Sequence, residues 1–356
     1  MKAAVLKTLG QPLVVETVPD PVLGTGEVIV DVVATRMLAY AGDVFSGQRQ
    51  YLLELPIVPG PGGIGRIRAV GPDATRLAVG DWVSIDPTVR SRDDTMSPDI
   101  ILQGLTAGSE AALRLQRHYH DGALAQQVRV PTENVTLIGE IDRADAGKWC
   151  AALGTLLVPY GGLLAARLLA GETLLVNGAT GAFGSAGVAV GIAMGAGRVV
   201  ATGRNEQALA DLERRFGDRV RTVKMTGTEE EDRRQMQKAA GGPIDVVLDL
   251  LPPMASPSWV RAAVLAVRSY GRAILMGGIR DDISLPYAWM MRECIEVRGQ
   301  WMYPREAPRR MVGLIRAGLI RLEEFAVTEF PLAKVNEAVA HAAANAGPFK
   351  MTVVRP

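Results

Sequence analysis

The chain has 356 residues, a formal net charge of +1, 48% hydrophobic and 22% charged residues, and two cysteines, Cys150 and Cys294. This length predicts two domains of a globular enzyme, and the near-neutral charge argues against nucleic acid or a membrane as a partner. Two cysteines exclude a disulfide framework and a zinc lobe of several cysteines, and they are typical of a reducing cytoplasm.

The first 140 residues have the pattern of short β-strands. Runs rich in β-branched residues at 28–33 and 64–70 predict strands, and shorter runs at 128–130 and 135–137 predict two more. Turn signals separate them, at Gly71-Pro72 and at Gly80-Asp81. We expect a barrel-like β domain here.

From about Cys150 the pattern changes to helices that alternate with strands, which is typical of a parallel sheet covered on both faces. An uncharged run, 150–166, predicts a buried helix that leads into this second domain, and it is too short to span a bilayer. The charge run at 229–234 predicts a solvated helix, and 306–317 predicts a surface helix. We expect strands at 173–177, 198–202, 220–224, 244–249, 272–276 and 294–299.

A glycine-rich turn follows the first of these strands and opens a helix of small residues. A helix N-terminus carries unpaired N–H groups and a partial positive charge, so it attracts an anion that can come close. Gly178 permits the tight turn, Gly181 removes the Cβ where a pyrophosphate approaches, and Gly184 lets the helix lie close. The residues expected to bind a dinucleotide at this turn are Gly178, Thr180, Gly181, Ala182, Phe183 and Gly184.

The end of the second strand indicates which dinucleotide binds. An acidic residue there would accept hydrogen bonds from a free ribose hydroxyl, but this chain has Gly203-Arg204-Asn205. An arginine suits a phosphorylated ribose, and Asn205 is placed to support it. We therefore predict NADP(H) as the cofactor; the alternative role for Arg204 is that of an ordinary surface arginine.

With this turn at mid-chain after a β-rich half, the sequence resembles the medium-chain dehydrogenase/reductase superfamily over almost its whole length. The resemblance implies a GroES-like β-barrel catalytic domain, 1–150 and 303–356, around a Rossmann domain with a doubly wound parallel sheet, 151–302. It also implies a nicotinamide cofactor that Gly277 helps to bind, and a homodimer. The segments that carry it are PIVPG at 56–60, VGDWV at 79–83, GALA at 122–125, DVVLD at 245–249, GRAILMG at 271–277 and FPL at 330–332.

The chain departs from this family at the catalytic zinc of its alcohol dehydrogenases. Tyr40 stands at the position of the cysteine ligand, and Pro61 and Gly62 replace the histidine and glutamate that follow Pro59-Gly60. The third ligand would fall near Gly154 or Thr155, which offer neither thiolate nor imidazole. We therefore expect no metal site. Within the family, the chain then resembles the zinc-free quinone and enone reductases more than the alcohol dehydrogenases.

Without a metal ion, hydride transfer favours an acceptor that is already electrophilic, such as a quinone or an alkene conjugated to a carbonyl. The enolate oxygen then needs a hydrogen-bond donor and the α-carbon needs a proton. Tyr40, at the former ligand position, and Tyr51 are the catalytic candidates; the alternative for each is a ring that packs in the wall of the site.

Three hypotheses for the function remain open from the sequence. The first is an NADPH-dependent, zinc-free reductase of quinones or α,β-unsaturated carbonyl compounds in the cytoplasm. The second is a zinc-free carbonyl reductase or alcohol dehydrogenase that uses Tyr40 as its proton donor. The third is an NADPH-binding protein without catalytic activity. In each case we expect a small-molecule ligand rather than a nucleic acid or a membrane.

Overall fold

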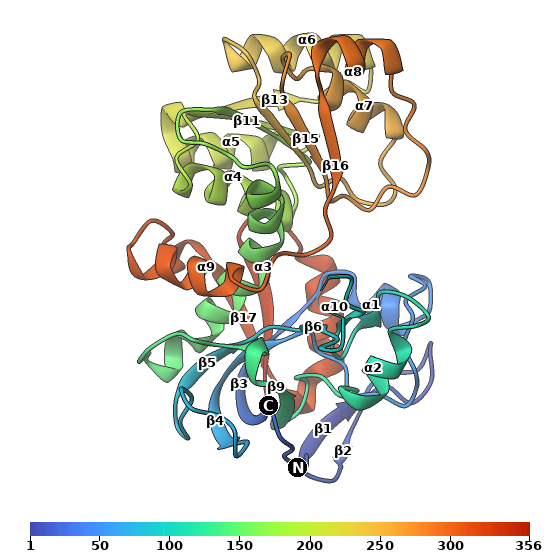
Figure 1. The fold of residues 1–356 in the computed structure, drawn as a ribbon, viewed down its shortest axis with the longest axis vertical. Helices are drawn as coiled ribbons and strands as arrows, with labels where there is room; N and C mark the ends of the chain where they lie inside the picture. Colours follow the sequence, from blue (N-terminus) through green and yellow to red (C-terminus); the bar gives the residue numbers. More distant parts are fainter. Residues whose placement is uncertain (95) are drawn as a thin grey trace. The chain divides into compact units, whose positions relative to one another are not determined.

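The computed structural model describes residues 1–94 and 96–356, and Figure 1 follows the chain through them by colour. Contacts divide the chain into two compact units. The first comprises 1–154, 322–346 and 350–356, and the second comprises 155–321 and 347–349. Both ends of the chain therefore belong to one unit, and most of the other unit lies between them in the sequence.

The second unit is built on a six-stranded sheet in which every neighbouring pair is parallel, in the order β13-β12-β11-β14-β15-β16. This order reverses direction after β11, as in a Rossmann sheet, so the carboxyl ends of β11 and its neighbours flank a ligand-binding position. All six predicted strands are confirmed. Their bounds are β11 Thr173–Asn177, β12 Arg198–Gly203, β13 Val220–Lys224, β14 Val246–Asp249, β15 Arg272–Leu275 and β16 Glu296–Gly299.

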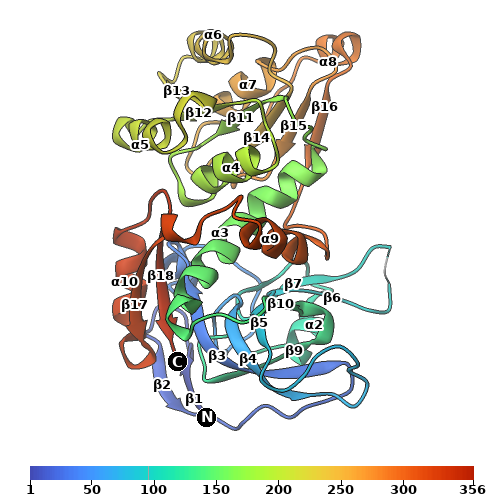
Figure 2. The ribbon, with the colours of Figure 1, turned by 90° about the vertical axis from the view of Figure 1, so that its left-hand side faces the viewer.

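Helices cover both faces of this sheet. In Figure 2, α4 and α5 lie on one face, where both contact β12, and α6 and α7 pack together on the other. The second face encloses a core of Val, Ile, Leu, Ala and Met side chains. The helix bounds in this unit are α4 Ala182–Ala193, α5 Glu206–Phe216, α6 Glu229–Ala240, α7 Pro257–Leu265, α8 Tyr287–Glu293 and α9 Ala307–Arg316.

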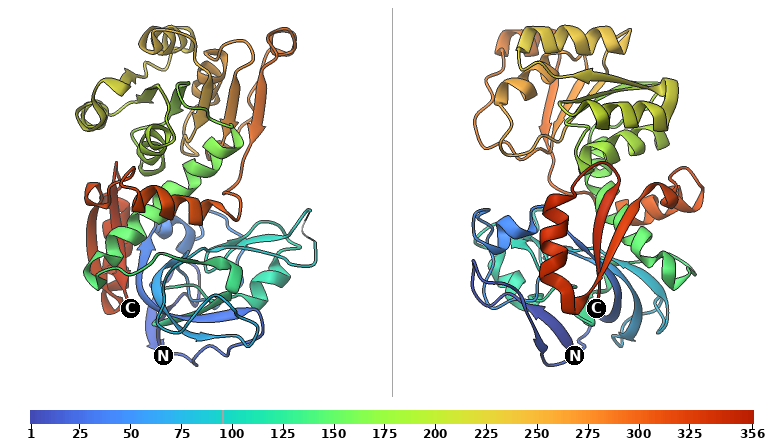
Figure 3. Two further views of the ribbon diagram at one scale, coloured as in Figure 1. Left: turned by 60° about the vertical axis from the view of Figure 1, so that its left-hand side comes forward. Right: turned by 180° about the vertical axis from the view of Figure 1, so that it is seen from behind.

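The first unit is the GroES-like β domain. A seven-stranded sheet runs β10-β5-β4-β3-β18-β17, with β9 also paired to β3, and smaller sheets are β1-β2 and β6-β7-β8. The C-terminal strand β18 pairs antiparallel with β3 and carries α10 against it (Figure 3). The strand bounds are β1 Lys2–Val5, β2 Val14–Thr17, β3 Glu27–Met37, β4 Gly63–Val70, β5 Trp82–Ile85, β6 Thr88–Arg90, β7 Ile100–Leu102, β8 Thr106–Ala107, β9 Gln127–Pro131, β10 Val135–Leu137, β17 Ala326–Pro331 and β18 Lys350–Arg355; the helices are α1 Ala41–Phe45, α2 Leu113–His118 and α10 Val335–Ala344.

A long helix, α3 Ala146–Ala165, carries the chain from the first unit into the second, as the uncharged run predicted. The segment 303–321, which the sequence assigned to the barrel domain, groups by its contacts with the parallel-sheet unit. One reason is close packing on the second half of α3: a Cβ added at Gly161 would lie 2.3 Å from the Met302 carbonyl oxygen. Among the helices described, none combines the length and the apolar character needed to cross a bilayer.

Candidate functional site

The glycine-rich turn at the end of β11 has the backbone of an anion site. Gly178 has φ +87°, a conformation that L-residues with a side chain rarely adopt. Gly181 is the N-cap of α4, and no side chain hydrogen-bonds to the cap. The N–H groups of the first turn, which begins with Ala182 and Phe183, are thus left for a ligand, and the helix dipole favours a negative one.

The other glycines hold this turn in place. A Cβ on Gly184 would lie 2.0 Å from the Gly178 carbonyl oxygen, so α4 lies directly on the turn. A Cβ on Gly203 would lie 2.3 Å from Cγ2 of Thr180, so the turn also rests on the end of β12. Gly181 differs, because its nearest neighbour would be 3.7 Å away. No protein contact requires a glycine there, which leaves close approach of a ligand as the physical reason.

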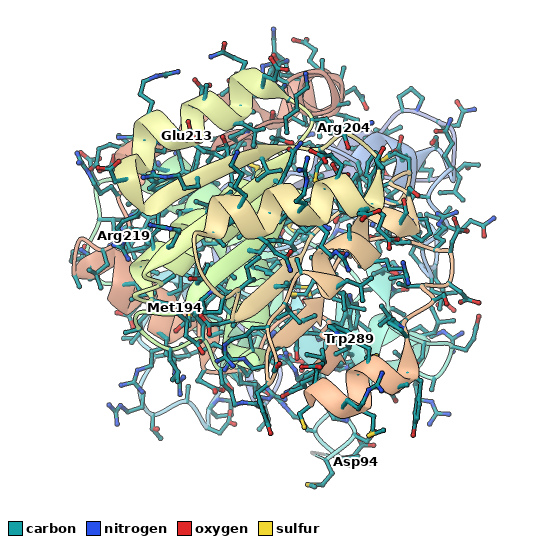
Figure 4. All side chains as sticks on the ribbon, turned by 90° about the horizontal axis from the view of Figure 1, so that it is seen from above. Asp94, Met194, Arg204, Glu213, Arg219 and Trp289 are labelled. Atoms are coloured by element: carbon teal, nitrogen blue, oxygen red, sulfur yellow. The ribbon has the colours of Figure 1, made fainter. Side chains whose placement is uncertain are left out.

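Arg204 follows β12 directly and is exposed (Figure 4). Its guanidinium carbon lies 5.0 Å from the centroid of the Trp259 ring, a cation–π arrangement. Within residues 1–94 and 96–356 it forms no ion pair with a carboxylate, so its charge is free for a ligand. Asn205 has a structural role, because its side chain accepts a hydrogen bond from the Ala208 N–H at 3.0 Å and caps α5.

Beneath the turn lies a buried polar network that the sequence analysis did not assign. Asn177 donates from Nδ2 to Oδ1 of Asp249 at 2.8 Å, and the Thr202 hydroxyl donates to Oδ1 of Asn177 at 2.9 Å. Asp249 and Asn177 end the neighbouring strands β14 and β11, and Thr202 is the last residue but one of β12. The signal in the sequence was a polar residue closing each apolar run. Gly277 completes the arrangement, since a Cβ there would lie 2.5 Å from Oδ2 of Asp249.

Burial dominates the electrostatics of this network. Asp249 is 2% exposed, and loss of solvent raises the pKa of its carboxyl to about 7, although hydrogen bonds from Asn177 and from the Leu251 backbone oppose the rise. The carboxyl is therefore protonated in part of its population near neutral pH.

In the first unit, the structure brings together Tyr40 and Tyr51. Their ring centroids are 6.4 Å apart in an edge-to-face arrangement, and the Arg49 guanidinium stacks 4.1 Å from the centroid of Tyr40 and 5.0 Å from that of Tyr51. Burial holds the pKa of Tyr40 well above its ordinary value, Tyr51 adds to the rise, and Arg36 and Arg49 oppose it. The Tyr40 phenol is thus neutral at physiological pH.

The residues at the family's zinc-ligand positions do not suit a zinc ion. A neutral phenol is a poor ligand, and the side chains of Pro61 and Gly62 have no lone pair to donate. The Arg36 side chain lies against this segment: its Nε donates to the Pro61 carbonyl oxygen at 3.2 Å, and a Cβ on Gly154 would lie 2.6 Å from its Cδ. Throughout the described ranges, no group of three or more His, Cys, Asp or Glu side chains could hold a metal ion.

The predicted site residues thus fall into two groups, one on each unit. The cofactor candidates meet at the carboxyl ends of β11, β12 and β15, and the two tyrosines meet after β3. The sequence analysis missed Arg36 and Arg49 beside Tyr40; an arginine in a run as apolar as VVATRML was the available signal.

Two family patterns match the chain, one in each unit. The pattern described as "Alcohol dehydrogenase GroES-like domain" matches residues 24–140, and the one described as "Zinc-binding dehydrogenase" matches residues 182–317. The first match covers most of the N-terminal part of the β domain, and the second covers most of the parallel-sheet unit.

The curated relatives are oxidoreductases. The chain is 28% identical over 307 residues to an alcohol dehydrogenase of Rhizobium meliloti (strain 1021), covering 86% of this chain and 85% of that protein. It is 27% identical over 270 residues to an L-arabinitol 4-dehydrogenase of Hypocrea jecorina, covering 75% and 68%. It is 32% identical over 224 residues to an acryloyl-coenzyme A reductase of Metallosphaera sedula (strain ATCC 51363 / DSM 5348 / JCM 9185 / NBRC 15509 / TH2), covering 62% and 63%.

Solved structures share the fold over the whole chain. A putative alcohol dehydrogenase from Sinorhizobium meliloti 1021 is 27% identical with a TM-score of 0.76, covering 100% of this chain and 96% of that one. A putative zinc-binding dehydrogenase from the same organism, bound to NADP, is 18% identical with a TM-score of 0.78, covering 100% and 99%.

Proposed function

We propose that this chain uses NADPH and no metal ion to reduce a quinone or an α,β-unsaturated carbonyl compound. The chain belongs to the medium-chain dehydrogenase/reductase superfamily and is an oxidoreductase of that family. The observation that carries the proposal is the set of residues at the family's zinc-ligand positions, where a neutral phenol, a proline and a glycine stand and two arginines lie nearby.

The choice of NADPH is supported by the end of β12. Arg204 is exposed, has no carboxylate partner in the described part of the chain, and follows Gly203 directly. An arginine–phosphate contact is charge-assisted and contributes about 1.5–3 kcal/mol, which corresponds to roughly ten- to a hundredfold in affinity. The uncapped start of α4 supports binding of the pyrophosphate, and Gly181 leaves it room.

When bound, NADPH would supply a hydride to the β-carbon of an enone. Negative charge would develop on the carbonyl oxygen, and a proton from solvent would add at the α-carbon. The Tyr40 hydroxyl, kept neutral by burial, holds a proton that it can donate in a hydrogen bond to that oxygen. A positioned donor of this kind is typically worth about 10²–10⁴-fold in rate.

The second candidate is reduction of ketones or oxidation of secondary alcohols, which the names of the alcohol and arabinitol dehydrogenase relatives favour. Oxidation of an alcohol needs a base to accept the hydroxyl proton. Tyr40 is poorly suited to that role, because burial disfavours its phenolate. The conjugated acceptor is therefore preferred, and the relative named acryloyl-coenzyme A reductase acts on such a substrate by its name.

The experiment follows NADPH absorbance with quinones, enones, activated ketones and cyclic imines, each with and without a chelator. Turnover of quinones or enones that the chelator leaves unchanged supports the proposal. Sensitivity to the chelator refutes metal independence, turnover of ketones alone favours the second candidate, and tight NADPH binding without turnover favours a non-catalytic protein.

We also propose that the protein is a cytoplasmic homodimer, joined through the edge of the parallel sheet. The strand β16 ends the sheet order, and an unpaired edge is a template for a second copy. Large exposed side chains, Tyr287, Met291 and Trp301, lie on α8 and just after β16. Light scattering during gel filtration tests this, because a monomeric mass at micromolar concentration refutes it.

A further inference from the structure

Two arginines flank Tyr40 without an acidic partner. Arg36, on β3, is 7% exposed, and the hydrogen bond from its Nε to the Pro61 carbonyl oxygen is its one side-chain hydrogen bond in the described residues. Arg49 is half-buried and stacks on the rings of Tyr40 and Tyr51. Across residues 1–94 and 96–356, neither guanidinium forms an ion pair with a carboxylate.

Two other partly buried arginines of the protein, by contrast, have carboxylate partners. Arg272 pairs with Glu172 at 2.5 Å, and Arg268 pairs with Asp245 at 2.6 Å. A largely shielded charge without a partner is poorly stabilised, because the interior replaces the lost water poorly. In the described residues the terminal nitrogens of Arg36 are not among the fully buried unpaired atoms, so an anion from outside the chain can reach them and compensate the charge.

The donors needed for such an anion are present. The bond to Pro61 uses only Nε of Arg36, so the two terminal nitrogens remain, in the fork geometry that matches a carboxylate. Stacking covers the face of the Arg49 guanidinium and leaves the N–H groups along its edge. Both positive charges act on the Tyr40 hydroxyl.

We propose that Arg36 and Arg49, with the hydroxyl of Tyr51, bind a carboxylate group of the substrate, so that the preferred substrates are α,β-unsaturated carbonyl compounds that carry a carboxylic acid. That the substrate also carries a reducible alkene rests on the function proposed above. Binding of its carboxylate does not depend on that function.

The first test compares trans-4-oxo-2-pentenoate with its methyl ester, two enones that differ in the negative charge. We expect kcat/KM for the acid to exceed that for the ester by at least about tenfold, since a charge-assisted contact is lost with the ester. Arg49→Met should abolish the preference, and so should Arg36→Met. Arg66→Met is the matched control, because Arg66 also stacks on an aromatic ring, Trp82, at 5.3 Å. An unchanged preference in Arg49→Met, or equal kcat/KM values in the wild type, overturns the proposal.

The second test measures binding without turnover. Calorimetry with 4-oxopentanoate, which has no alkene to reduce, should show binding that its methyl ester lacks and that Arg49→Met weakens at least about tenfold. Binding of the saturated acid without turnover of either enone would refute the proposed function and leave the carboxylate site standing. Equal binding of acid and ester refutes the site. Arg49→Met serves as the decisive variant if Arg36→Met does not fold.

Discussion

Replacing Asp249 by asparagine should stabilise the protein at alkaline pH and leave its stability nearly unchanged at acidic pH. The carboxyl is 2% exposed, and burial raises its pKa from 3.8 to about 7. Between these two values the folded protein retains a proton that the unfolded chain has lost. The free energy of unfolding therefore falls as pH rises from about 4 to about 7. Above about pH 7 the titration of Asp249 causes no further change.

The size of the effect follows from the shift. A rise from 3.8 to about 7 is about 3 pH units, and each unit corresponds to about 1.4 kcal/mol, so the wild type loses at most about 4 kcal/mol. Asparagine has the same shape and carries no charge. Its one oxygen can accept from Asn177 or from the Leu251 backbone N–H but not from both, so the variant loses one hydrogen bond at every pH, about 1 kcal/mol. Against this constant loss, the variant should recover about 4 kcal/mol at about pH 8 and only about 1.6 kcal/mol at about pH 5.

The assay is thermal unfolding followed by circular dichroism at both pH values, with hydrogen exchange of β14 to assign the change to the parallel-sheet unit. Asp281 is exposed, so Asp281→Asn is the matched control and should change the melting temperature at neither pH. The difference between variant and wild type removes the titration of all other groups. A gain of equal size at both pH values, or a loss at alkaline pH, would show that Asp249 is not a protonated buried carboxyl.

Three further predictions concern the cofactor and the reaction. Arg204→Asp should raise KM for NADPH by at least about tenfold and improve the use of NADH, because it removes a phosphate partner; steady-state kinetics with unchanged NADPH values would contradict the assignment. Gly181→Ala should weaken NADPH binding with little change in melting temperature, whereas Gly184→Ala should lower the melting temperature, because its Cβ would lie 2.0 Å from the Gly178 carbonyl oxygen. Fluorescence titration and calorimetry distinguish the two, and full NADPH affinity in the Gly181 variant would remove the close-approach argument. Tyr40→Phe should lower kcat for enones by about 10²–10⁴-fold with little change in NADPH affinity. Wild-type kcat in that variant would leave Tyr40 as a packing residue.

The strands of the parallel sheet could be predicted because each is a short apolar run with polar or glycine residues at its ends. The glycine turn could be predicted because its three glycines each answer a local need at a strand–helix junction. The boundaries of the two units were harder to predict from the sequence. The segment 303–321 packs with α3, and no local pattern encodes which neighbour a surface helix chooses.

The sequence by itself determined the dinucleotide turn, the arginine after β12, and the absence of zinc-ligating side chains at 40, 61 and 62, because each depends on residue types at fixed short spacings. Only the tertiary structure decided what surrounds them. Asn177 and Asp249 meet because strand order brings β14 beside β11. Arg49 lies over Tyr40 because the segment after α1 folds back on that ring, and the charge of Arg36 acts on the Tyr40 hydroxyl from β3. Long-range pairing sets burial and the neighbouring charges, and these in turn set the pKa values.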